Sequence, residues 1–267
     1  MDSCSKSVKF RATKRLLTSW FGCRNSRGKP LIAREDHRWY ICGVRPVLAA
    51  IVVFLFAQSL VAQKTVSFPT EDGGIVYGDV YGEGSRGVLL AHGGQFNKES
   101  WKKQALVLAG AGFVVLAIDF RGYGQSRGPG QSDVLSAPLY FDVLAAVRYL
   151  RGNGAKTVSI VGASLGGWAA ADASIRSEPG EIDRLVFLGS SPIRDAEKLK
   201  TRSLFIVARD DTSGDGPRLP GIRAQYEKTP EPKELIIVDG SAHAQFLFQT
   251  DQGEKVMDEI LRFLSNQ

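Results

Sequence analysis

Ser164 is the residue whose surroundings point most clearly to chemistry. It lies in a Gly-x-Ser-x-Gly motif at residues 162–166 (GASLG), directly after the strand-like stretch 157–161 and before a helix-forming stretch. Between a strand and a helix this motif makes a sharp turn that presents the serine hydroxyl above the sheet, and its glycines avoid collisions with nearby backbone. An ordinary tight turn is the competing interpretation. The strand-turn-helix context favours a serine nucleophile.

A serine hydroxyl is a weak nucleophile until a base removes its proton, so a histidine must lie within hydrogen-bond distance. Beyond residue 63 the chain contains only His92 and His243. His92 begins a His-Gly-Gly loop after an early strand, and such a loop is suited to presenting backbone N–H groups to a developing oxyanion. His243 follows the last predicted strand. The chain order serine, acid, histidine therefore leaves His243 as the candidate base.

The carboxylate that orients this histidine should follow a strand between Ser164 and His243. The apolar run 203–208 (SLFIVA) leads through one arginine into Asp210 and Asp211, so either of these fits. Asp215 is a third, more distant candidate. Asp119 precedes the serine in the chain, and we expect it to hold a loop together.

The elements that must position these residues follow from the spacing of apolar residues. Short runs of consecutive apolar residues indicate parallel strands, because helices cover both faces of a parallel sheet. These runs are 87–91, 113–118, 157–161, 185–188, 203–208 and 235–238, and stretches with helical spacing occupy 99–111, 138–151, 165–176 and 253–264. Residues 66–81 predict an antiparallel hairpin with a turn at Asp72-Gly73-Gly74. The pattern predicts a three-layer α/β sandwich with a mostly parallel sheet and an antiparallel N-terminal hairpin.

Together these motifs resemble the α/β-hydrolase superfamily, from about Val66 to Leu264. The resemblance rests on the His-Gly-Gly loop, an Asp-x-Arg-Gly-x-Gly-x-Ser run at 119–126, the turn around Ser164 and the His243 loop, all in the family's order. It implies that Ser164 is the nucleophile and His243 the base. It also implies that Asp211 is the acid, with Asp210 as the alternative.

The same resemblance implies an oxyanion hole formed by two backbone amides. One is the amide of Leu165, directly after the nucleophile. The other is the amide of Gly94 in the His-Gly-Gly loop, with Gln95 as the alternative.

The family's variable lid is usually inserted after the strand that ends near Leu188, where this chain has only 14 residues before Ser203. The resemblance therefore implies an open, capless site like that of small serine esterases and compact dienelactone-hydrolase-like proteins, although the latter typically have cysteine at the position of Ser164. We expect a cofactor-free serine hydrolase that cleaves carboxylic esters or thioesters. An acyltransferase of the same fold and a non-catalytic binding module are the alternatives.

Charge and composition exclude several other classes of protein. The 267-residue chain has a formal net charge of +6, but residues 64–267 carry 23 basic and 25 acidic groups, so this part has no electrostatic reason to bind nucleic acid. The three cysteines, Cys4, Cys23 and Cys42, lie before residue 46, and the chain has three histidines in all. We therefore expect neither a metal site nor a cofactor.

The N-terminal part of the sequence predicts export. Residues 1–45 form a basic tail with 11 basic and 3 acidic groups, and the uncharged, apolar segment 46–63 has the length of a signal peptide or a membrane anchor. The charge bias predicts that the domain formed by residues 64–267 lies outside the cytosol, periplasmic, secreted or membrane-anchored through 46–63. Met1 and Met257 are the only methionines, and a true translation start near Val44 would leave a signal peptide of ordinary length.

Overall fold

The structure, a computed structural model, describes residues 63–190 and 193–266. The predicted basic tail and all but the last residue of the apolar segment 46–63 lie outside the described residues. Within those residues, the helices are too short or too polar to cross a bilayer.

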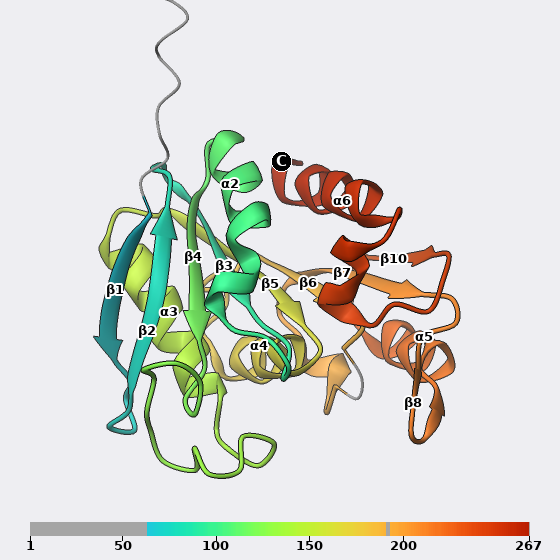
Figure 1. Cartoon of the computed structure of the whole chain (residues 1–267), viewed down its shortest axis with the longest axis horizontal. Coiled ribbons are helices and arrows are strands. Elements are labelled where there is room, and N and C mark those ends of the chain that lie inside the picture. The colour runs from blue at the N-terminus through green and yellow to red at the C-terminus, as the bar shows by residue number, and fades with distance from the viewer. Residues whose placement is uncertain (1–62, 191–192, 267) are drawn as a thin grey trace, which may run out of the picture. The chain divides into compact units, whose positions relative to one another are not determined.

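The core of the domain is an eight-stranded sheet with the strand order β1-β2-β4-β3-β5-β6-β7-β10 (Figure 1). β1 pairs antiparallel with β2, and β2 pairs antiparallel with β4, while the remaining neighbours are parallel. This confirms the predicted mostly parallel sheet with an antiparallel N-terminal hairpin. The strands are β1 (Lys64–Pro69), β2 (Ile75–Tyr81), β3 (Arg86–Ala91), β4 (Val114–Asp119), β5 (Thr157–Ala163), β6 (Arg184–Leu188), β7 (Arg202–Ala208) and β10 (Lys233–Val238).

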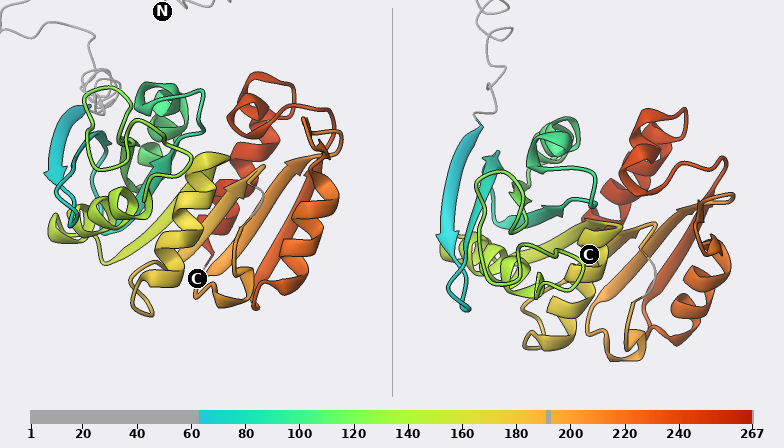
Figure 2. Two further views of the ribbon diagram at one scale, coloured as in Figure 1. Left: turned by 90° about the horizontal axis from the view of Figure 1, so that it is seen from below. Right: turned by 60° about the horizontal axis from the view of Figure 1, so that its bottom comes forward.

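Helices cover both faces of the sheet and enclose two apolar cores (Figures 1 and 2). Successive residues of β3 alternate between these cores: Leu89 belongs to one, and Val88 and Leu90 to the other. Side chains alternate across a strand, so a strand covered on both faces has to be apolar throughout. One face is covered by α2 (Lys102–Gly110) and α6 (Gly253–Ser265), and the other by α3 (Tyr140–Gly152), α4 (Leu165–Arg176) and α5 (Leu219–Lys228).

Among the described helices that cover the sheet, α5 is the one that the spacing of apolar residues does not predict. Its first turn contains Pro220 and Gly221, and only Ile222 and Gln225 of its ten residues are buried. Proline is tolerated in the first turn of a helix, because the N–H it lacks has no intrahelical acceptor there. Because so few of its residues are buried, the sequence of α5 shows little apolar periodicity. The helix is stabilised by its packing against β7.

Short elements complete the connections. They are the 3₁₀ helices η1 (Lys98–Trp101), η2 (Ala196–Lys198) and η3 (Ala244–Gln249) and the two-stranded pair β8 (Thr212–Ser213) and β9 (Gly216–Pro217). In the described part of the connection between β6 and β7, η2 is the only such element.

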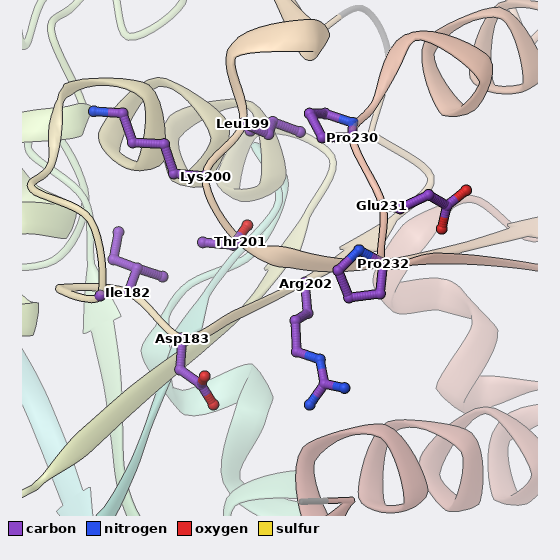
Figure 3. Close-up of a pocket in the computed structure, with 10 residues that line it drawn as sticks. Ile182, Asp183, Leu199, Lys200, Thr201, Arg202, Pro230, Glu231 and Pro232 are labelled. Carbon is purple, nitrogen blue, oxygen red and sulfur yellow. The ribbon is translucent and has the colours of Figure 1, made fainter.

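A cavity of about 350 Å³ lies at the amino ends of β6, β7 and β10 (Figure 3). Its lining includes Asp183, Thr201, Arg202 and Pro232, which lie just before or at the start of these strands. The candidate site residues follow the carboxyl ends of β3, β5, β7 and β10, so this cavity is not part of their site.

Candidate active site

The turn that carries Ser164 is strained and tightly packed. Ser164 has φ 48° and ψ −110°, a conformation that a residue with a Cβ rarely adopts, and its N–H donates to the carbonyl of Leu188 at 2.9 Å. A Cβ on Gly166 would lie 2.2 Å from the carbonyl oxygen of Ala91, and one on Gly167 would lie 1.9 Å from Ser190 Oγ. The glycines thus let helix α4 approach β3 and the loop after β6, which holds the strained turn in place.

A continuous chain of hydrogen bonds joins Ser164, His243 and Asp211. His243 Nε2 lies 2.9 Å from Ser164 Oγ, and its Nδ1 lies 2.8 Å from Asp211 Oδ2. An ionised carboxylate can only accept, so Nδ1 carries the proton and Nε2 is free to accept from the serine hydroxyl. The His243 side chain is 26% exposed, which leaves the imidazole open to solvent and substrate on one side.

Asp211, rather than Asp210, lies against the histidine. The Asp211 side chain is 1% exposed, and its other oxygen, Oδ1, lies 3.4 Å from Arg218 Nε in an ion pair. The Arg218 N–H also donates to the Asp211 carbonyl at 2.9 Å. Asp210 and Asp215 are exposed. A tight turn, in which Asp211 N–H donates to Ala208 O, reverses the chain after β7 and directs Asp211 inward.

The loop after β3 forms a turn closed by the Phe96 N–H, which donates to the Gly93 carbonyl at 2.9 Å. The Gly93 N–H donates to Gln245 Oε1 at 2.7 Å, so this amide is occupied. A Cβ on Gly94 would lie 3.9 Å from Leu165 Cδ2, so Gly94 faces the start of α4. The amide of Leu165 is the first of that helix and has no intrahelical acceptor. The structure therefore brings Gly94 and Leu165 together beside Ser164.

His92 is buried under this loop and stabilises it through hydrogen bonds. It is fully buried, its Nδ1 lies 2.8 Å from the Gly93 carbonyl, and its Nε2 accepts from the Phe120 N–H at 3.2 Å. The Tyr123 ring stands edge-on to it, and the Tyr123 hydroxyl donates to the Gly94 carbonyl at 2.8 Å. Burial lowers the pKa of His92 to about 4, because the interior disfavours the imidazolium.

The buried His92 should make the stability of the fold depend on pH. Its pKa rises from about 4 in the folded protein to its ordinary value of 6.5 on unfolding, so the unfolded state binds the proton more tightly. The stability that neutral His92 contributes is thus present above pH 6.5 and is lost as the pH falls toward 4. We expect this residue alone to lower the free energy of unfolding by about 3 kcal/mol between pH 7 and pH 4.

Urea unfolding at several pH values measures this loss, and His92→Asn is the reference, since its amide can still donate to Gly93. The difference between the two proteins should shrink as the pH falls. Parallel pH profiles, or an NMR titration that places the His92 pKa near 6.5 in the folded protein, would contradict the expectation.

The Asp119–Ser126 run holds neighbouring segments together, and of its residues Tyr123 contacts a site group, the Gly94 carbonyl. Asp119 Oδ1 accepts from the Lys98 N–H at 2.8 Å, which ties the end of β4 to η1. Arg121 is fully buried and paired with Asp142 and with Asp72. Burial raises the pKa of Asp119 and of Asp142 above the usual range, although their polar partners oppose it. This agrees with the loop-holding role expected for Asp119.

Three residues that contact the site groups escape sequence reasoning: Gln245, Arg218 and Tyr123. Gln245 contacts Gly93 and Tyr123 contacts Gly94, which are 152 and 29 residues away in the chain. Arg218 contacts Asp211 across the short β8–β9 pair. Only Tyr123 lies in a run that the motifs single out. Within the described residues, no cluster of three or more histidine, cysteine, aspartate or glutamate side chains could hold a metal ion.

A family model described as "Alpha/beta hydrolase family" matches residues 88–256. A pimeloyl-(acyl-carrier protein) methyl ester esterase from Cronobacter sakazakii is 33% identical over 111 residues, which are 42% of this chain and 39% of that protein. A non-heme haloperoxidase from Rhodococcus erythropolis is 31% identical over 121 residues, 45% of this chain and 42% of that protein. The chain thus spans less than half the length of these curated relatives.

Solved structures show the same fold at low sequence identity. An esterase from Exiguobacterium antarcticum has a TM-score of 0.63 and 15% identity, with 76% of this chain and 100% of that chain covered. An esterase from Pyrococcus furiosus has a TM-score of 0.64 and 19% identity, with 88% of this chain and 98% of that chain covered.

Proposed function

Because the chain belongs to the alpha/beta hydrolase family and its distant relatives include esterases, we propose that it is a serine hydrolase that cleaves carboxylic esters or thioesters. The observation that carries the proposal is the unbroken chain of hydrogen bonds from Asp211 through His243 to Ser164. Such a chain supplies a nucleophile, a base and the group that orients the base.

In the first half of the reaction Ser164 Oγ attacks the carbonyl carbon while His243 Nε2 takes the hydroxyl proton. The carbonyl π electrons move to the oxygen and form a tetrahedral oxyanion. This intermediate collapses to an acyl-enzyme as the bond to the alcohol or thiol breaks, and His243 returns its proton to the leaving group. Water then attacks the acyl carbon with His243 again as base, which releases the acid and restores Ser164.

The proposed oxyanion hole consists of the amides of Gly94 and Leu165. Two observations support this choice: the neighbouring Gly93 amide is already bonded to Gln245, and Gly94 lies close to the Leu165 side chain. The carbonyl of Gly94 is bonded to Tyr123, which limits rotation of the peptide between Gly94 and Gln95. Leu165 also begins the 12-residue helix α4, whose positive end faces the developing negative charge.

A fluorophosphonate probe tests the proposal directly. The probe should label the native protein on a single serine, and peptide mapping by mass spectrometry should place the label on Ser164. The heat-denatured protein should not react, because the hydroxyl is activated only when the fold holds His243 beside it. The native protein should also hydrolyse p-nitrophenyl esters in a chain-length series and release free acid.

Absence of labelling together with absence of ester hydrolysis would leave a binding module as the better reading of this fold. A label on another serine would assign the nucleophile to that serine and not to Ser164. Transfer of the acyl group to an added alcohol in preference to water would identify an acyltransferase.

A further inference from the structure

Gln245 makes two hydrogen bonds that join the three loops around the site. Its Oε1 accepts from the Gly93 N–H at 2.7 Å, and its Nε2 donates to Ser100 Oγ at 2.9 Å. The residue is 4% exposed and lies two positions after His243, at the start of η3. We propose that Gln245 is a positioning residue that locks the oxyanion loop to the segment carrying the catalytic histidine, an inference that rests on the proposed hydrolase function.

The oxyanion loop depends on such an external bond because it begins with two glycines. Gly93 and Gly94 have no side chains to restrict their backbone, and glycine loses more conformational freedom on ordering than any other residue. Their peptide groups are instead held by hydrogen bonds. The Gly93 N–H donates to Gln245, the Gly93 carbonyl accepts from His92 and from the Phe96 N–H, and the Gly94 carbonyl accepts from Tyr123. Of these bonds, the one to Gln245 fixes the peptide that immediately precedes the Gly94 amide.

Ser100 holds the second end of the Gln245 amide. The Gly93 N–H can only donate and therefore pairs with Oε1, and this leaves Nε2 to donate to the Ser100 hydroxyl. Ser100 lies in η1, and its hydroxyl donates to the Asn97 carbonyl. Without this acceptor, the amide is held by the single bond to Gly93 and gains freedom to rotate about it.

The backbone around Gln245 is itself held in an unusual conformation. Ala244, between His243 and Gln245, has φ 50°, which costs energy for a residue with a Cβ. Ala244 and Leu247 are buried in the core beneath α2 and α6, so η3 is anchored on that side. A single strained turn therefore sets the places of both His243 and the group that holds the oxyanion loop.

Replacement of Gln245 by methionine tests the inference, because methionine has a similar length but forms neither hydrogen bond. Removal of one oxyanion-hole donor lowers kcat about 10²- to 10³-fold, and a donor that is only loosened should cost less. We expect kcat of Gln245→Met to fall about 10- to 100-fold, with KM changed by less than about threefold. The matched control is Gln249→Met, an exposed position at the end of the same 3₁₀ helix, which should keep the wild-type kcat.

A trifluoromethyl ketone substrate analogue separates this role from a merely structural one. Ser164 adds reversibly to its carbonyl carbon, the serine proton passes to His243, and the ketone oxygen becomes an oxyanion like that of the intermediate. Its Kd should therefore rise in Gln245→Met by the same factor by which kcat/KM falls, while the thermal midpoint confirms that the protein is folded.

A folded Gln245→Met protein with a kcat within twofold of wild type would overturn the inference, as would a reduced kcat with unchanged affinity for the ketone. If that variant does not fold, Ser100→Ala takes its place, because it removes only the acceptor that orients the amide. Its kcat should fall about three- to tenfold at constant KM, as expected for a loosened donor, and an unchanged kcat would refute the role. A wild-type protein that neither hydrolyses esters nor binds the ketone would refute the proposed function as well.

Discussion

Ser164→Ala should abolish ester hydrolysis, with a fall in kcat of about 10⁴- to 10⁶-fold. In the proposed mechanism the Oγ atom forms the bond to the acyl carbon, and it lies 2.9 Å from His243 Nε2, the atom that takes its proton. The fold should persist, because the hydroxyl hydrogen-bonds to His243 and not to the core, and alanine retains the Cβ and the strained φ of the turn. Steady-state assays with a p-nitrophenyl ester measure the loss.

A thermal midpoint close to that of the wild type shows that such a loss is chemical and not structural. The variant should also fail to react with the fluorophosphonate. More than a tenth of the wild-type kcat in a preparation free of wild-type protein would end the serine-nucleophile mechanism.

The two adjacent aspartates should differ sharply in their effect. Asp211→Asn is expected to lower kcat about 10³- to 10⁴-fold, since an amide can donate to His243 Nδ1 and thereby stabilises the tautomer that cannot accept from Ser164. It also leaves Arg218 without its anionic partner. Asp210→Asn is the matched control: its side chain is exposed, and kcat should stay within about twofold, as for surface substitutions away from such contacts.

Raising the pH should not restore Asp211→Asn, because the imidazole is already neutral and the defect is which of its two nitrogens carries the proton. A loss in Asp210→Asn as large as that in Asp211→Asn would contradict the geometry. Small losses in both variants would mean that another group orients His243.

Local chemistry was sufficient to predict the layers of the domain and the serine turn. Strands covered on both faces are apolar along most of their length, as in β3 and β5, and the hairpin turn at Gly73 requires a positive φ of 85°. The turn around Ser164 was equally visible, because its steric demand for glycine is met by neighbours in sequence. In each case the constraint lies within a few residues of the chain.

The tertiary structure decided the relations between distant segments. Asp210 and Asp211 are adjacent in sequence and chemically identical, and only the turn after β7 determines that Asp211 is the one that meets His243. Gln245 has no motif, because its contact with Gly93 is made by the packing of η3 against the loop after β3. These two hydrogen bonds join groups 32 and 152 residues apart in the chain. They depend on where the sheet brings the ends of its strands together, which the local preferences of short segments do not determine.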